Sequence, residues 1–175
     1  MFGINRGGNR EEIEATQVMH PGKQQLPLSV ELERKRDMRT QFGALCYRIV
    51  KNKTQILLIT SRRTKRWVIP KGWPMQGKTP AESAVQEAWE EAGVKGKVTG
   101  PCLALYSYEK RVPGMGTLPC AVMVFPVKVS ALSDRFPERT QRKRKWMSPK
   151  KAAQKIAEPE LAHFVRRFDA QRFGL

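Results

Sequence analysis

Three glutamates, Glu87, Glu90 and Glu91, stand close together in the segment QEAWEEAGV. On an α-helix, residues spaced i, i+3 and i+4 lie on one face, so the three carboxylates would project in the same direction. Like charges at this spacing repel one another, and a bound cation relieves the repulsion. Carboxylate oxygens are hard ligands that suit Mg²⁺ or Mn²⁺. The spacing therefore predicts a divalent-metal site, with a solvated acidic helix face as the alternative.

The segment that carries these glutamates has the signals of a short, well-defined helix. Thr79 is a good N-cap, Pro80 suits the first helical position, and Glu82 completes a capping box. Gly93 supplies the stop. The face opposite the glutamates is small and apolar, which suits close packing on a sheet: Ala81, Val85, Ala88 and Ala92. We therefore expect a helix between Thr79 and Gly93 that holds the carboxylates in fixed positions.

The same segment resembles the Nudix box, whose pattern is Gly-x5-Glu-x7-Arg-Glu-U-x-Glu-Glu-x-Gly-U, where U is a bulky apolar residue. The matching positions are Gly72, Glu87, Glu90, Glu91, Gly93 and Val94. The resemblance implies an α/β/α sandwich that cleaves a nucleoside diphosphate linked to another group. It also implies that the three glutamates hold divalent metal, helped by the Gly72 carbonyl.

Two positions depart from the box. Lys78 replaces its first glutamate, which would put a positive charge near the metal cluster. Gln86 replaces its arginine. In the family the arginine usually helps to hold the following glutamate, and Gln86 can do so only through an uncharged hydrogen bond.

Further segments resemble one branch of the family, the diphosphoinositol polyphosphate phosphohydrolases, which also hydrolyse diadenosine polyphosphates. They are Ser61-Arg62-x-x-x-Arg66-Trp67-Val68-Ile69-Pro70 and Arg142-Lys143-Arg144-Lys145-Trp146. The start Pro70-Lys71-Gly72 is similar instead to dinucleoside tetraphosphate hydrolases. Together the resemblances imply these candidate phosphate contacts: Ser61, Arg62, Arg66, Lys71 and Lys143. The simpler interpretations are an ordinary basic turn at Arg62 to Arg66, and a solvated or nucleic-acid-binding surface at Lys143.

Two carboxylates are candidates for the general base in phosphoanhydride hydrolysis, and the sequence does not decide between them. Glu87 belongs to the predicted helix, whereas Glu109 lies at the end of a predicted strand, before a loop. Glu109 is equally well interpreted as an exposed acid that pairs with Lys110 or Arg111. Trp73, in the loop before the helix, either stacks on a nucleobase or anchors the loop by packing.

The formal net charge of +17 requires a strongly anionic partner: polyphosphate, nucleotide, nucleic acid or an acidic surface. A chain of 175 residues suits one domain, placed at residues 39–175, after a polar arm at 1–38 with little regular structure. No apolar run reaches membrane-spanning length and no signal-peptide core is evident, so we expect no membrane contact. Cys46, Cys102 and Cys120 are interpreted as buried free thiols of a reducing, cytoplasmic location. His20 and His163 are too far apart in sequence to suggest zinc.

The remaining pattern is typical of strands mixed with helices. Strands are predicted at residues 42–49, 55–60, 67–69 and 120–129, with one or two more between 97 and 108. Helices are predicted from Pro149 to about residue 157 and from Pro159 to about residue 172. This pattern favours a mixed α/β fold in which helices cover a sheet.

The sequence thus predicts a Nudix hydrolase that uses Mg²⁺ or Mn²⁺ to cleave phosphoanhydride bonds of a polyphosphorylated molecule. The candidate substrates are diadenosine polyphosphate, diphosphoinositol polyphosphate and polyphosphate. An RNA 5′-pyrophosphohydrolase is a second hypothesis, because the same helix and basic surface could serve an RNA end. A nucleotide- or RNA-binding module with a decayed site is a third, motivated by Lys78 and Gln86.

Overall fold

The computed structural model describes residues 38–114 and 116–175, so the predicted N-terminal arm lies outside the described residues except for its last position. The described chain forms one eight-stranded sheet and three helices. The strands are β1 (Arg39–Val50), β2 (Lys53–Thr60), β3 (Trp67–Val68), β4 (Lys71–Gly72), β5 (Val94–Val98), β6 (Ala104–Val112), β7 (Gly116–Leu132) and β8 (Arg144–Met147). The helices are α1 (Pro80–Ala92), α2 (Pro149–Ala153) and α3 (Pro159–Arg167).

The parallel pair of β1 and β7 forms the centre of the sheet. Their register runs from Arg39 opposite Cys120 to Tyr47 opposite Lys128. The strand order is β3-β2-β1-β7-β5, with β4 beside β1, β6 beside β7 and β8 beside β2. These other pairs are antiparallel, so the sheet is mixed.

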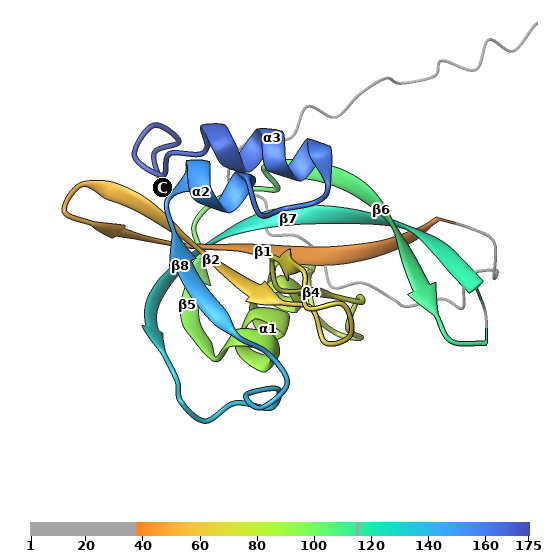
Figure 1. The fold of residues 1–175 in the computed structure, drawn as a ribbon. Coiled ribbons are helices and arrows are strands. Elements are labelled where there is room, and N and C mark those ends of the chain that lie inside the picture. Colours follow the sequence, from red (N-terminus) through yellow and green to blue (C-terminus); the bar gives the residue numbers. More distant parts are fainter. Residues whose placement is uncertain (1–37, 115) are drawn as a thin grey trace, which may run out of the picture.

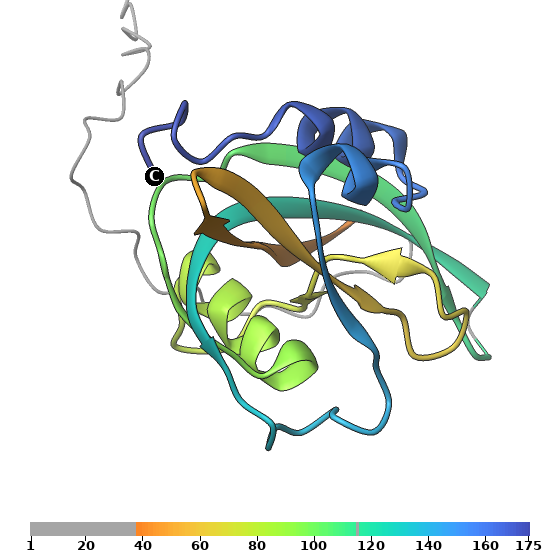
Figure 2. The same cartoon turned by 60° about the vertical axis from the view of Figure 1, so that its left-hand side comes forward.

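Helices cover both faces of the sheet, with α1 on one side and α2 and α3 on the other (Figures 1 and 2). Strand β2 contributes side chains to the hydrophobic cores on both faces of the sheet, because successive residues of a strand point to opposite faces. Leu57 and Ile59 join the core that includes Ala88 of α1. Leu58 joins the other core, which includes Val165 of α3. The expected α/β/α sandwich is confirmed.

Helix α1 has the ends that the sequence predicts. The side chains of Thr79 and Glu82 form the two reciprocal hydrogen bonds of a capping box. Gly93 follows the helix at φ 65°, in the left-handed region that favours glycine. Ala88 and Ala92 are fully buried. The helix therefore lies close against the sheet, and its glutamate face is held in a fixed direction.

The two C-terminal helices are shorter than the sequence predicts. Helix α2 ends at Ala153 instead of near residue 157, and α3 ends at Arg167 instead of near residue 172. The chain leaves the helical path at Phe168 because this side chain is buried, with its ring centroid 5.7 Å from that of Tyr47. None of the described helices is long and apolar enough to span a membrane. Cys46 and Cys120 are buried free thiols, as expected, whereas the free thiol of Cys102 is only partly buried.

The short edge strand β8 is not predicted by the sequence, because it lies in a run of basic residues. It pairs with β2 from Arg144 opposite Ile59 to Met147 opposite Ile56. Its side chains alternate as in any strand. Arg144 donates to the carbonyl of Ala92 at the end of α1, whereas Met147 joins the core on the opposite face. This alternation decides which basic residues reach the site.

Candidate active site

Glu87 lies against the backbone of Gly72, between strand β4 and helix α1. A Cβ atom added to Gly72 would overlap the Glu87 carboxylate, so glycine is needed for this approach. Burial, and then the nearby charges of Glu91, Glu90 and Glu138, together raise the pKa of Glu87 to about 7. Arg142 opposes these effects. Glu87 is therefore a carboxyl group that titrates near neutral pH and is surrounded by other carboxylates.

Glu91 is buried, with 8% of its surface exposed, and both of its oxygens have partners. One oxygen accepts from the Arg142 guanidinium in a close ion pair, and the other accepts from the Lys71 backbone N–H at 3.0 Å. Burial raises the pKa of the Glu91 carboxyl, while the charges of Arg142 and Lys71 act to lower it. The carboxylate is thus tied to β4 and to the segment before β8.

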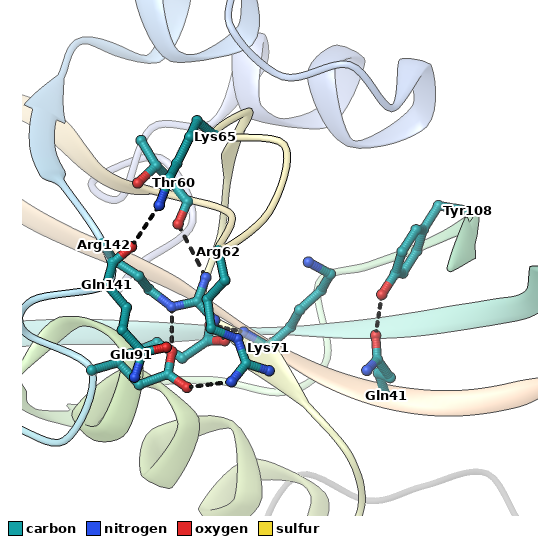
Figure 3. Close-up of polar contacts among 10 residues, drawn as sticks. Gln41, Thr60, Arg62, Lys65, Lys71, Glu91, Tyr108, Gln141 and Arg142 are labelled. Atoms are coloured by element: carbon teal, nitrogen blue, oxygen red, sulfur yellow. Dashed lines mark hydrogen bonds and ion pairs between the residues drawn. The ribbon is translucent and has the colours of Figure 1, made fainter. Parts of the chain in front are cut away.

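Arg142 is the buried cation of the site, with 6% of its side chain exposed (Figure 3). Each of its three guanidinium nitrogens donates to a different group. Nη2 donates to Glu91, Nε donates to Glu138 in a second close ion pair, and Nη1 donates to the Thr60 carbonyl at 3.1 Å. The Glu138 carboxylate also pairs with Arg62 at 3.3 Å. The result is an alternating chain of charges that joins α1, the end of β2 and the loop before β8.

Glu90 is held by groups other than Arg142. Gln86 Nε2 donates to the Glu90 carboxylate at 2.7 Å, one helical turn away. The Glu138 backbone N–H donates to the Glu90 carbonyl at 3.0 Å. Gln86 therefore makes the expected uncharged hydrogen bond, but to Glu90 and not to Glu87. The correction follows from geometry, because on a helix the side chain four residues away is a neighbour and the next one is not.

The oxygen donors fit a divalent cation in chemical type. Glu87 and Glu90 are half-buried and side by side with Glu91, and their crowding is the kind that a hard cation relieves. Among the described residues, no three acidic, histidine or cysteine side chains already stand close enough to hold a metal ion. A carboxylate offers about four acceptor positions, so Glu91 keeps free lone pairs beside its two partners. The side chains of Glu87 and Glu90 would have to turn to complete a site.

Of the predicted phosphate contacts, the structure places Arg62 and Lys71 beside the carboxylates. Arg62 reaches the site through Glu138 but is 60% exposed. The Lys71 ammonium lies 5.1 Å from the centre of the Tyr108 ring. Burial lowers the pKa of Lys71, and the charge of Glu91 acts to raise it. Both cations can therefore meet an anion that approaches the acidic cluster.

The other predicted contacts have different surroundings. Ser61 bonds within its own turn, to Thr64 at 2.7 Å and to the Arg66 backbone N–H at 3.1 Å. Arg66 pairs with Glu158 at 3.8 Å, at the start of α3. Lys143 is exposed, and its backbone pairs with Thr60. As contacts with a phosphate, these three residues stay predictions.

Glu109, the second candidate base, is exposed on β6. The residues on either side of it, Tyr108 and Lys110, lie on the opposite face of the strand, which is the face directed toward the site. The Lys110 ammonium lies 4.3 Å from the centre of the Trp73 ring. Tyr108 donates to Gln41 at 2.6 Å (Figure 3). The structure does not bring Glu109 to the carboxylate cluster. Trp73 and Lys110 instead form a cation–aromatic pair near the site.

A family model described as the NUDIX domain matches residues 39–168, which is most of the chain. The chain belongs to the Nudix family. Nudix hydrolase 12, mitochondrial, of Arabidopsis thaliana is 30% identical over an alignment of 132 residues that covers 66% of this chain and 65% of that protein. Diphosphoinositol polyphosphate phosphohydrolase 3-alpha of Homo sapiens is 39% identical over 56 residues, 32% of this chain and 34% of that protein. The chain thus spans less than two thirds of the length of these relatives.

The fold agrees with that of solved Nudix proteins. The Ap4A hydrolase of C. elegans, crystallised as a binary complex, matches with a TM-score of 0.62 at 22% identity. The match covers 79% of this chain and all of that one. At this identity the likeness supports the fold, and substrate specificity is a separate question.

Within the Nudix box, the structure corrects the expectation for Lys78. This residue lies on the flank of α1 away from Glu87, where it lines a surface pocket of about 370 Å³ with Glu82, Val85 and Lys97. Its ammonium acts on Glu82, whose pKa is lowered chiefly by the hydrogen bond from the Thr79 backbone N–H. Lys78 therefore adds its positive charge to the helix cap and not to the carboxylate cluster.

Sequence reasoning misses Arg142 and Glu138 as site residues. A signal for Arg142 is present in the run Arg142–Lys145, because the segment just before β8 already pairs with Thr60 through Lys143, and successive residues of an extended segment point to opposite sides. Arg142 and Arg144 point to buried partners, and Lys143 and Lys145 are exposed. Glu138 has no comparable signal, because it lies in a loop whose path depends on the whole fold.

Proposed function

We propose that this chain is a Nudix pyrophosphohydrolase that cleaves phosphoanhydride bonds of a polyphosphorylated substrate with the help of Mg²⁺ or Mn²⁺. The observation that carries the proposal is the meeting of four carboxylates with cations at the box helix. The carboxylates belong to Glu87, Glu90, Glu91 and Glu138, and the cations around them to Arg62, Lys71 and Arg142. Such a site offers both carboxylate oxygens that would bind a metal after Glu87 and Glu90 turn, and positive charge for phosphate oxygens.

The residues of the chain would divide the work as follows. Glu87, Glu90, Glu91 and the Gly72 carbonyl would hold the metal, which supplies charge neutralisation of the phosphate oxygens and a more acidic water. Glu87 is the better placed candidate base, because its carboxylate lies against Gly72 beside the acidic cluster, whereas Glu109 is exposed on β6 and away from it. Lys71 and Arg62 would neutralise the phosphates outside this centre.

The substrate class is proposed from the relatives and from charge. The names of similar proteins include diphosphoinositol polyphosphate phosphohydrolases and an Ap4A hydrolase. All such substrates carry several linked phosphates, which suits a chain with a net charge of +17. We therefore propose a diadenosine polyphosphate, a diphosphoinositol polyphosphate or inorganic polyphosphate as the substrate.

A direct test is to incubate the purified protein with Mg²⁺, or with Mn²⁺, and a panel of these three substrate types plus 5′-triphosphate RNA. Products are identified by mass spectrometry, and Glu91→Gln serves as the inactive control. We expect cleavage of one class, at a phosphoanhydride bond, that the control lacks. Turnover that persists in Glu91→Gln, or no turnover of any substrate with either metal, would refute the proposal.

An RNA 5′-pyrophosphohydrolase is the second candidate, favoured by the distribution of charge. Several of the acidic groups of the described chain gather at the site, while the segments that carry Arg62 and Arg142 also carry exposed cations: Arg63, Lys65, Lys143 and Lys145. If RNA is the substrate, its affinity should fall steeply with added salt, because binding releases counterions from the phosphates. Salt-sensitive RNA binding without any turnover would favour the third hypothesis, a binding module.

We also propose a cytoplasmic location, on the ground that Cys46, Cys102 and Cys120 are all free thiols, which suits a reducing compartment. Two similar plant proteins carry the word mitochondrial in their names. Cell fractionation with an antibody to the chain would decide between the two compartments.

A further inference from the structure

Arg142 stands out among the described cations because burial and full hydrogen bonding coincide in its guanidinium. Only 6% of the side chain is exposed, and its three nitrogens donate to three acceptors on three segments of the chain. The two carboxylate partners are themselves mostly buried, with 10% and 18% of their side chains exposed. A substrate phosphate could reach this guanidinium only by displacing Glu91 or Glu138.

The two partners of Glu91 bind different oxygens of its carboxylate and come from different segments of the chain. Arg142 holds one oxygen and the Lys71 backbone N–H holds the other, so the carboxylate plane has one orientation. Glu138 and the Thr60 carbonyl in turn hold the guanidinium. An arginine stays charged at any ordinary pH and presents its donors in a rigid fork, which a lysine does not.

Gln86 does not perform this task. Its amide donates to Glu90, one turn along the same helix, and it carries no charge. In this chain the box helix therefore receives its guanidinium from outside the helix, from a residue 51 positions away in sequence.

From these contacts we infer that Arg142 is a positioning residue, which orients Glu91 and which Glu138 fixes in place. The inference rests on the proposed function, because the oriented carboxylate is one of the proposed metal-binding groups. Arg142 acts through Glu91 and makes no contact of its own with the substrate. Glu91 then presents its free lone pairs in one direction to an incoming cation.

The decisive variant is Arg142→Lys, which keeps the positive charge and removes the fork. We expect kcat to fall by more than about tenfold while KM changes less than about twofold, since the interaction lost is not one with the substrate. Mn²⁺ affinity, measured by calorimetry without substrate, should weaken at least about threefold. Arg144→Lys is the matched control, because Arg144 is a partly buried arginine that likewise donates to three groups, in Ala92, Ser133 and Asp134, all outside the cluster. It should leave kcat and Mn²⁺ affinity within about twofold of wild type.

Glu138→Gln gives a second test if Arg142→Lys does not fold, because Arg142 then keeps Glu91 and Thr60 as partners. We expect a smaller fall of kcat in the same direction, again with little change in KM. The inference is overturned if Arg142→Lys changes kcat and Mn²⁺ affinity no more than Arg144→Lys. It is also overturned if KM rises while kcat is kept, because Arg142 would then bind the substrate. Absence of turnover in the wild type would refute the proposed function alone, since the Mn²⁺ titrations still judge Arg142.

Discussion

Replacing Glu87 with glutamine should stabilise the metal-free protein at pH 8. Burial first, and then neighbouring carboxylates, raise the pKa of Glu87 from 4.5 to about 7. The folded protein therefore holds this proton more tightly than the unfolded chain does. As pH rises from about 4.5 to about 7, ionisation of Glu87 lowers the free energy of unfolding, and below that window the loss disappears.

The magnitude follows from the shift. At about 1.4 kcal/mol per pKa unit, the difference corresponds to about 3 kcal/mol for a fully shielded carboxyl group. Glu87 is only partly buried, so solvent screening reduces the expected effect to about 1–2 kcal/mol. In a domain of this size, Glu87→Gln should raise Tm by roughly 3–7 °C at pH 8.

The assay is thermal unfolding followed by circular dichroism in EDTA, at pH 5 and at pH 8. The gain should be much smaller at pH 5, where Glu87 of the folded wild type is mostly protonated. Glu82→Gln is the control with the opposite sign, because hydrogen bonds from Thr79 lower the pKa of Glu82. That carboxylate stabilises the protein above its unfolded pKa, so its replacement should lower Tm at pH 8. A Glu87→Gln protein with the same or a lower Tm at pH 8, or with an equal gain at both pH values, would refute the reasoning.

Three further substitutions test the site. Gly72→Ala should lower kcat by at least about tenfold with little change in Tm, because the new Cβ displaces the flexible end of Glu87. Steady-state kinetics measure kcat, and melting curves measure Tm. Gln86→Arg should change kcat less than about twofold, because its hydrogen-bond partner is Glu90; a large gain in the same assay would contradict this contact. Glu91→Gln should abolish turnover and lower the free energy of unfolding by about 1–3 kcal/mol in urea titrations, because a buried guanidinium loses its charged partner.

The parts of the fold that depend on neighbours in sequence can be predicted from the sequence. Helix α1 is an example, since Thr79, Glu82 and Gly93 specify its ends through contacts within one or two turns. The common direction of its glutamates follows from helical periodicity alone. The end of α3 cannot be predicted in this way. It depends on the burial of Phe168 against Tyr47, two residues that are distant in sequence and meet only when β1 is in place.

The partner of Glu91 shows the same limit within the site. A run of four basic residues predicts positive charge near the substrate, but not which side chains point inward. That choice depends on β8 being an edge strand in register with β2, which places Arg144 opposite Ile59. This register is a tertiary property that also fixes the segment just before β8, where Lys143 pairs with Thr60, so the sequence alone does not predict which side chain turns inward.

The division of charge in this chain bears on how a substrate would arrive. The net charge is +17, yet the box helix and the loop before β8 bring Glu87, Glu90, Glu91 and Glu138 to one place. The surroundings therefore attract a polyanion over several ångströms, whereas the site itself attracts a cation. A polyphosphate that already carries a divalent ion satisfies both attractions at once, and a bare polyphosphate would be repelled by the carboxylates on final approach. Association of the substrate should accordingly depend on both salt and metal. The two dependences are separable, because Glu87→Gln removes a proposed metal-binding carboxylate and should weaken the metal dependence while the salt dependence remains.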